Sequence, residues 1–166
     1  MDFRIKQTDD VSLIQDMDQV CFPGESLPEA DEAVWWVVLD EDGREAAYAG
    51  GIVDTYSPGV HDLFMNRAGV LPEYRGQGLQ RRLIHTRYRF ACREGYRSCY
   101  TYTVPFNYRS SNNLIRCGFT LWRPAWAWAG DEALYWHRAA NAPSRQLAGP
   151  ELMPLPASPE FVPRIK

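Results

Sequence analysis

The sequence predicts a single α/β domain in which helices pack on a mixed sheet, and three observations support this prediction. The chain has 166 residues, of which 45% are hydrophobic and 13% aromatic, enough to bury a core in one domain. Short apolar runs alternate with segments of helical periodicity along the first 140 residues. Six of the twelve prolines lie at or beyond Pro143, which indicates an extended tail. We therefore expect a folded domain at 1–140 and a Pro-rich tail at 141–166.

The first strand and helix are predicted by alternation and by capping residues. Residues 3–6 alternate apolar and charged side chains, as a strand does. Residues 8–10, Thr-Asp-Asp, can cap a helix over 11–20 whose apolar side chains recur on one face. The Cys-Phe-Pro-Gly sequence at 21–24 ends this helix. The acidic residues that follow, 25–31, are expected to form a loop or a short helix.

A hairpin is predicted next. Residues 33–39 are rich in Trp and Val, and the Glu-Asp-Gly-Arg turn at 41–44 returns the chain into a strand at 46–53. The Gly50-Gly51 pair inside that strand predicts a bulge or the close approach of another backbone. Residues 56–60 are expected to form a loop.

A strand and a glycine turn follow, and their backbone is predicted to bind a ligand. Within the strand expected at 62–71, residues 66–69 are less apolar than a buried strand should be. This predicts a bulge or a splayed edge that frees backbone groups. Pro72 has no N–H to donate, so it ends the ladder. Gly76 and Gly78 permit backbone angles that let successive amides converge on one small volume.

The helix predicted over 79–94, which ends at Gly95, completes this site. Its first turn offers free N–H groups and the positive end of the helix dipole, so the segment predicts a pyrophosphate site. The alternative is an ordinary strand-to-helix turn in which the glycines serve geometry alone. Arginines near the turn are expected beside the anion and the more distal ones on a solvated helix face; they are Arg81, Arg82, Arg87, Arg89 and Arg93.

The last elements are another strand, a capped helix and a closing pair of strands. Residues 98–104 alternate aromatic and hydroxyl side chains, which is typical of a strand. Asn107 can cap a helix over 108–117, and Gly118 ends it. Residues 119–122 and 133–138 are expected to form the closing strands.

Composition limits the function classes. The net charge of −3 gives no global field to attract nucleic acid. Neither the four cysteines nor the three histidines show metal-ligand spacing, and the cysteines show no disulfide framework, so we expect no metal site. With no signal peptide and no long apolar run, we expect no membrane segment and a cytoplasmic location.

The sequence from Arg75 to Gln80, Arg-Gly-Gln-Gly-Leu-Gln, resembles the acetyl-CoA-binding motif of the GNAT family of N-acetyltransferases, Arg/Gln-x-x-Gly-x-Gly/Ala. Arg75 and Gly78 match this motif. Gln80 stands where the family usually has a small residue, so the fit around the phosphates is expected to differ there. The segment is not a Walker loop, because no Gly-Lys-Ser/Thr follows the glycines.

A second motif of the same family is matched in spacing by Asn107-x-x-Ser110-x-x-x-Leu114-x-x-x-Gly118-Phe119. Together the two motifs cover about residues 63–122. The resemblance implies a mixed, mostly antiparallel sheet of six to seven strands flanked by helices. It also implies acetyl-CoA as the cofactor, bound by Val70, Leu71, Arg75, Gly76, Gln77, Gly78, Leu79, Gln80, Arg81, Asn107 and Ser110.

The entry Cys21-Phe22-Pro23 and the segment from Asn107 also resemble, more weakly, the ribosomal-protein alanine N-acetyltransferases. In that branch a glutamate stands at the position of Tyr102 as base, and a tyrosine stands at the position of Leu114 as acid. Both departures leave the proton-transfer residues open. Tyr102 and Tyr108 are the nearest phenols by sequence that could serve, and Glu25 could face an amine.

The resemblance implies transfer of an acetyl group from acetyl-CoA to a primary amine by direct attack in a ternary complex. The acceptor is expected to be a small molecule or a peptide N-terminus. Leu114 and Tyr102 motivate an alternative, a non-catalytic acyl-CoA-binding or interaction module. An RNA-binding domain is poorly supported, because the chain is acidic overall. The apolar residues of the tail are expected to pack on the domain or on a second subunit, which leaves a homodimer open.

Overall fold

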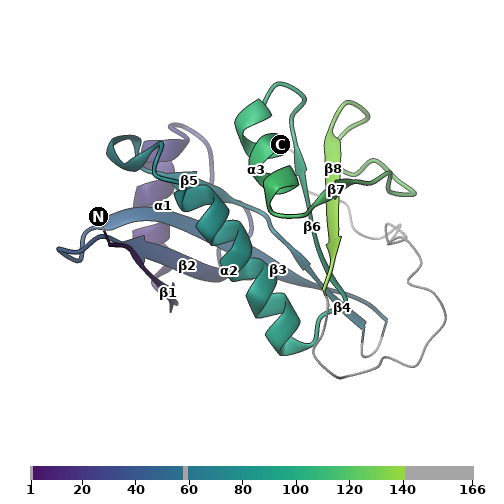
Figure 1. Cartoon of the computed structure of the whole chain (residues 1–166), viewed down its shortest axis with the longest axis horizontal. Coiled ribbons are helices and arrows are strands. Elements are labelled where there is room, and N and C mark those ends of the chain that lie inside the picture. Colours follow the sequence, from purple (N-terminus) through teal and green to yellow (C-terminus); the bar gives the residue numbers. More distant parts are fainter. Residues whose placement is uncertain (1, 58–59, 141–166) are drawn as a thin grey trace.

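The computed structural model describes residues 2–57 and 60–140, and Figure 1 shows its elements. In chain order they are β1 (Arg4–Thr8), α1 (Val11–Cys21), β2 (Val34–Leu39), β3 (Glu45–Ser57), β4 (Val60–Phe64), β5 (Ala68–Val70), the 3-10 helix η1 (Pro72–Tyr74), α2 (Leu79–Glu94), β6 (Ser98–Thr103), α3 (Tyr108–Arg116), β7 (Thr120–Leu121) and β8 (Leu134–Ala139). The tail predicted at 141–166, and with it a homodimer through the tail, lies outside the described residues.

The strands form one mixed sheet in the order β1-β2-β3-β4-β6-β8-β7, with β5 paired to β3 off this path. Neighbouring strands are antiparallel, except that β4 and β6 run parallel. The predicted mixed, mostly antiparallel architecture is confirmed. The sheet has eight strands rather than six to seven, because the segment predicted as one strand at 62–71 is divided into β4 and β5.

Helices cover both faces of the sheet (Figure 1): α2 and α3 lie on one face and α1 lies on the other. Alternate residues of β3 show the two layers, as the period of a strand requires. Ala47 packs in an apolar cluster with Leu83 of α2, whereas Tyr48 packs in a cluster with Ile14 of α1. Among the described residues, no helix combines the length and the apolar character that crossing a bilayer requires.

The predicted helix caps are confirmed. The Asp10 side chain accepts from the Leu13 N–H at 3.0 Å, and the Asn107 side chain accepts from the Ser110 N–H at 3.2 Å. Gly95 ends α2 with a φ of 77°, a left-handed conformation that glycine adopts without steric cost. Local chemistry therefore fixes where these three helices begin or end.

Two predictions about β3 need revision. This strand continues to Ser57 and β4 begins at Val60, so strands replace most of the loop expected at 56–60. The Gly50-Gly51 pair carries no register shift. The close approach at Gly50 comes from side chains rather than from another backbone, since a Cβ there would lie 2.5 Å from Asn66 Oδ1 and 2.5 Å from a ring carbon of Trp35.

Candidate functional site

The sheet separates at the junction of β4 and β5. Phe64 of β4 pairs with Tyr100 of β6, and this is the last pair between those strands. Beyond it, β6 pairs with β8 alone, while residues 68–70 pair with β3 alone. The segment between Phe64 and Ala68 has no strand conformation. The splayed edge predicted at 66–69 is therefore present, and it opens a gap between β5 and β6.

The backbone of β5 directs two residues toward this gap. The Gly50 N–H donates to the Arg67 carbonyl at 2.8 Å, and the Leu71 N–H donates to the Ala46 carbonyl at 3.0 Å. In an antiparallel ladder, alternate residues bond to the partner strand and the residues between them face the other way. Ala68 and Val70 therefore present their peptide groups to the gap. There the Val70 carbonyl accepts from Arg75 Nε at 3.2 Å, and an extended ligand could pair with the other groups.

The glycine turn has the conformation that the sequence predicts. Gly76 and Gly78 have φ values of 83° and 76°, in the left-handed region where side chains are strained. The first bond of α2 runs from the Arg82 N–H to the Gly78 carbonyl at 3.2 Å. The amides of Leu79 and Gln80 lie before that bond, within the first turn of the helix, so they are free for an anion.

A hydrogen bond anchors the turn to the hairpin between β2 and β3. The Tyr74 hydroxyl donates to Asp40 Oδ2 at 2.8 Å, and the Arg44 N–H donates to Asp40 Oδ1 at 2.9 Å. The Tyr74 donation, together with the backbone amides, holds the pKa of Asp40 below its ordinary value. The segment that leads into the glycine turn is thus held against this hairpin.

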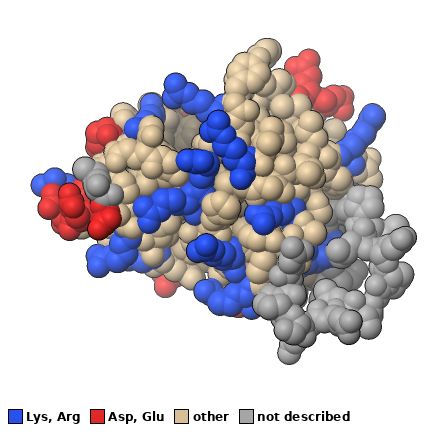
Figure 2. Space-filling view, viewed as in Figure 1, with Lys and Arg blue, Asp and Glu red and all other residues tan. Residues whose placement is uncertain are grey.

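A groove of about 680 Å³ connects the glycine turn with the gap. Its floor is β5, and its walls are the start of α2 and the start of α3. Figure 2 shows that Lys and Arg gather on the face covered by α2 and α3. The arginines that line the groove come from three elements and are Arg75, Arg81, Arg109 and Arg116.

Gln80 joins the two helices across the groove. Its Nε2 donates to Ser110 Oγ at 2.8 Å, and its Oε1 accepts from Asn113 Nδ2 at 2.7 Å. The family motif has a small residue at this position. Here the longer side chain occupies the space between the helices and satisfies both of its polar ends.

The structure brings most of the predicted cofactor residues together. Those that line the groove are Val70, Arg75, Gly76, Gly78, Leu79, Gln80, Arg81, Asn107 and Ser110. Gln77 is exposed beside the turn and does not line it. Leu71 also lies outside, because its N–H bonds to β3 and its side chain packs in the core.

The groove lining extends to the C-terminus of α1, where Cys21 and Phe22 contribute to it. Because α1 lies on the face opposite α2 (Figure 1), the groove has lining residues from both sides of the sheet. Burial raises the pKa of the Cys21 thiol above its ordinary value, so the thiol is protonated at neutral pH.

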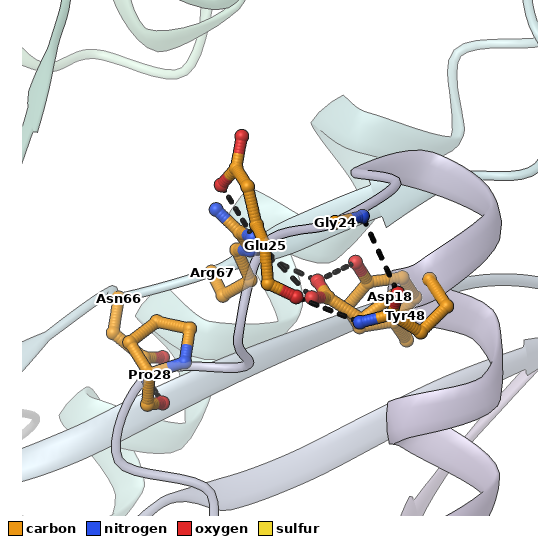
Figure 3. Close-up of polar contacts among 8 residues, drawn as sticks. Asp18, Gly24, Glu25, Pro28, Tyr48, Asn66 and Arg67 are labelled. Atoms are coloured by element: carbon orange, nitrogen blue, oxygen red, sulfur yellow. Dashed lines mark hydrogen bonds and ion pairs between the residues drawn. The ribbon is translucent and has the colours of Figure 1, made fainter.

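Arg67 links α1 to the loop that follows it, as Figure 3 shows, although neither Arg67 nor Glu25 lines the groove. Its Nε lies 2.9 Å from Asp18 Oδ1 and its Nη2 lies 2.8 Å from Glu25 Oε2. Its guanidinium also lies 3.8 Å above the ring of Phe22. Asp18 is fully buried and also accepts from the Tyr48 hydroxyl, whereas the Glu25 side chain is 59% exposed. Glu25 is therefore held in place with its carboxylate open to solvent.

The predicted proton-transfer candidates lie outside the groove lining. Tyr102 is on the part of β6 that no longer pairs with β4. Its ring stacks on that of Phe64, with 6.4 Å between the ring centroids. Tyr108 is the first residue of α3 and is 65% exposed. Leu114 is buried in the core beneath α3, where it has no chemical role.

Two sets of residues depart from the expectations or were missed. Arg87, expected at the ligand or in solvent with the other arginines, is buried with 4% exposure. The polar wall that α3 contributes was missed, although its residues follow a helical spacing of i, i+3, i+4 and i+7 that marks one face. These residues are Arg109, Asn112, Asn113 and Arg116.

Comparisons with known proteins agree with this architecture. The model of the acetyltransferase (GNAT) family matches residues 7–119. No curated protein sequence gives a significant match. Many solved structures are similar, among them the ribosomal-protein-S18-alanine N-acetyltransferase from Escherichia coli, with a TM-score of 0.67, 16% identity, and coverage of 88% of this chain and 99% of that chain.

Two further structures have the same fold at lower identity. Arabidopsis thaliana Naa50, in complex with the bisubstrate analogue CoA-Ac-MVNAL, has a TM-score of 0.69 and 13% identity and covers 83% of this chain and 99% of its own. The spermidine/spermine N-acetyltransferase SpeG from Vibrio cholerae, in mutant forms, has a TM-score of 0.65 and 12% identity. The match covers 83% of this chain and 94% of that chain. At these identities the similarity establishes the fold.

Proposed function

The chain belongs to the acetyltransferase (GNAT) family, and on this premise we propose that it transfers an acetyl group from acetyl-CoA to a primary amine. The acceptor is a small molecule or a peptide N-terminus. One observation carries the proposal: a single groove joins a helix N-terminus suited to a diphosphate with a strand edge suited to an extended arm.

The groove fits acetyl-CoA in charge and in shape. The amides at the start of α2 and the arginines around the turn match the charge of a diphosphate. Space beside the glycines is open, since a Cβ on Gly76 would meet nothing within 4 Å. The Ala68 peptide groups and the Val70 N–H offer donors and an acceptor to the amides of the pantetheine arm, whereas the Val70 carbonyl already accepts from Arg75 Nε at 3.2 Å. Asn107 and Ser110 face the same groove from α3.

Acetyl-CoA would supply the acetyl group as a thioester. In the proposed reaction the amine nitrogen forms a bond to the carbonyl carbon, the carbon–sulfur bond breaks, the amine loses a proton and the thiolate gains one. In this proposal the Ala68 N–H would polarise the carbonyl oxygen, which is the kind of contact that lowers a barrier most. Holding both reactants in one groove supplies several kcal/mol more.

The acceptor enters at the α1 end of the groove in this proposal. Glu25 does not line the groove, but it follows Phe22, which does, by three residues, and its carboxylate is open to solvent, so it can attract an ammonium group. We assign proton transfer to Tyr102, with Tyr108 as the alternative, because Tyr102 stands on the part of β6 beside the gap. General acid catalysis typically adds ~10²–10⁴-fold, so the scaffold keeps a measurable rate without it.

The burial of Leu114 favours a second candidate function. The residue that stands where related enzymes have a tyrosine packs in the core at 4% exposure. A protein that retained the coenzyme groove but lost the general acid that protonates the thiolate would bind acyl-CoA without turnover. The two functions differ in one measurable product, free CoA.

Titration with acetyl-CoA and an amine panel tests the proposal. Isothermal calorimetry measures binding to the intact chain, and chromatography measures the CoA released with small amines and peptides. Chromatography is preferred to a thiol reagent because the protein has four cysteines of its own. We expect binding and acceptor-dependent release of CoA. Binding without release supports the module, and no binding contradicts both functions.

A further inference from the structure

Arg87 lies on α2 with its guanidinium inside the protein. Its exposure is 4%. Its Nη1 donates to the Gly50 carbonyl at 3.1 Å, and its Nε donates to the Leu83 carbonyl of its own helix at 3.3 Å. Burial lowers the pKa of the guanidinium to about 10, so the group is still charged at neutral pH. A buried cation therefore contacts a strand carbonyl in the interior.

Gly50 lies where β3 changes its partner. The residue before it, Ala49, is opposite Ala68 of β5, and Ile52 is opposite Phe64 of β4. A strand that exchanges one neighbour for another has backbone groups without a ladder partner at the exchange point. The carbonyl contacted by Arg87 is such a group.

The pair formed by Gly50 and Arg67 is only half made. The Gly50 N–H donates to the Arg67 carbonyl at 2.8 Å. In an unbroken antiparallel ladder, a pair of this kind exchanges two bonds, the second from the Arg67 N–H to the Gly50 carbonyl. Here Arg87 donates to that carbonyl instead. The guanidinium thus takes the place of a backbone bond that would continue β5 toward β4.

The surroundings of Arg87 are apolar. One cluster beneath α2 contains Ala49 and Leu83, and a second contains Leu63 and Ile84. Arg87 follows both helix residues by one turn, so it lies where the two clusters meet. Within the described ranges, no carboxylate forms an ion pair with it. Burying a charge without a counter-ion is costly, and packing alone would favour an apolar side chain here.

We propose that Arg87 is a positioning residue that keeps β5 separated from β4 and thereby holds the Ala68 and Val70 peptide groups at the gap. Only a long side chain with several donors reaches from the helix to a strand carbonyl and satisfies it. The catalytic consequence rests on the proposed function, since these peptide groups are the ones that would align the thioester. The structural consequence does not depend on it.

Replacing Arg87 by methionine removes the donors and keeps an unbranched side chain of similar length. The Gly50 carbonyl then lacks its partner, and the Arg67 N–H is the opposed donor on the same edge. Forming that bond completes the ladder pair and draws residues 65–67 toward β3. Residues 67 and 69 then both bond to β3, so Ala68 still faces the gap, but the changed path of residues 65–67 shifts the position of its peptide there.

Three variants of the full chain test this: Arg87→Met, Arg87→Lys and, as the matched control, Arg89→Met. Arg89 is exposed on the same helix and does not line the groove. The dissociation constants of acetyl-CoA and CoA are compared by calorimetry, because the two compounds differ only in the acetyl group and no acceptor is needed. The rate of amide hydrogen exchange at Arg67 shows whether its N–H bonds to the Gly50 carbonyl. Urea denaturation measures the free energy of unfolding.

We expect Arg87→Met to shift the ratio of the two dissociation constants about three- to tenfold in favour of CoA, the worth of one hydrogen bond. The Arg67 amide should exchange more slowly in this variant. Arg87→Lys keeps a cation and a donor, so its ratio of dissociation constants and its Arg67 exchange rate should lie between those of Arg87→Met and the parent. Arg89→Met should match the parent.

A loss of stability in Arg87→Met with an unchanged ratio and unchanged Arg67 exchange would overturn the proposal, since Arg87 would then serve packing alone. If the parent protein binds neither compound, the proposed function fails. In that case the exchange of the Arg67 amide still decides the role of Arg87. Unchanged exchange rejects the role, and slower exchange in Arg87→Met supports it.

Discussion

Gln80 of α2 donates through its Nε2 to Ser110 Oγ of α3 over 2.8 Å, which ties together two helices that begin on opposite sides of the groove. Asn113 extends the contact by donating to Gln80 Oε1 at 2.7 Å. A side chain that departs from the family motif at this position therefore has a structural reason, the fixed spacing of the groove walls.

Gln80→Ala should loosen this spacing. The variant has the small residue that the family motif usually carries, and it loses two hydrogen bonds of about 0.5–1.5 kcal/mol each. We expect the free energy of unfolding to fall by about 1–2 kcal/mol in urea titrations, with weaker CoA binding. Gln80→Glu keeps the length and adds a negative charge near the phosphates, so its CoA affinity should fall further. Equal affinity of both variants and the parent would show that the contact has no part in binding.

Gly78→Asp should abolish CoA binding while the fold persists. The residue has a φ of 76° and a Cβ there meets only Arg81 Nη2, at 3.5 Å, so the side chain fits with modest strain. A negative charge at the N-terminus of α2 even interacts favourably with the helix dipole, but it repels a diphosphate a few ångströms away. Repulsion of about 3 kcal/mol corresponds to a loss of roughly 100-fold.

Gly78→Asn is the control for that experiment, because asparagine has the same shape, tolerates the left-handed region and carries no charge. Calorimetric titration with CoA should separate the two variants clearly, whereas their thermal unfolding should be similar. Tight binding by Gly78→Asp would mean that the phosphates lie elsewhere.

Arg67→Met should destabilise the protein far more than Glu25→Gln. The first change leaves the carboxylate of Asp18, which is fully buried, without its cation. Such a loss costs about 3–5 kcal/mol. The second change removes an ion pair whose carboxylate is 59% exposed, and pairs of this kind contribute about 0–1 kcal/mol.

The same two variants separate stability from acceptor binding. In the acetyl-transfer assay, Glu25→Gln should raise KM for a cationic amine and leave the affinity for CoA unchanged. Urea denaturation and steady-state kinetics measure the two effects. A similar loss of stability in both variants, or an unchanged KM in Glu25→Gln, would contradict the roles assigned to these side chains.

Tyr102→Phe should lower kcat about 10²-fold if its phenol protonates the leaving thiolate. The substitution keeps the ring that stacks on Phe64 at 6.4 Å, so stability should hardly change. Tyr108→Phe, which alters an exposed residue at the start of α3, is the counterpart and should retain the parent rate. The opposite result would transfer the role to Tyr108, and two unaffected variants would exclude both phenols.

The parts of the fold that could be predicted are those determined by neighbouring residues. Asn107 and Gly95 define helix ends through their own backbone or side chain, and the angles at Gly76 and Gly78 follow from the absence of a Cβ. The splayed edge at 66–69 was visible as a loss of apolar character. These features need only a few consecutive residues to be recognised.

The parts that could not be predicted depend on residues far apart in the chain. Arg67 pairs with Asp18 across 49 positions, and nothing near either residue marks the other. Arg87 follows the pattern of an exposed basic helix, and only the unsatisfied carbonyl of Gly50 on the sheet makes its burial favourable. Polar groups in a core are placed by tertiary contacts, which periodicity does not encode.

The lining residues on both sides of the sheet have a consequence for the order of events. In the proposed reaction coenzyme and acceptor approach from different sides, so neither blocks the path of the other and either product can depart first. Double-reciprocal plots for the two substrates should then intersect rather than run parallel. Substitutions in residues 22–33, which follow α1, can therefore change the selectivity for the amine without changing the glycine turn that would bind the nucleotide.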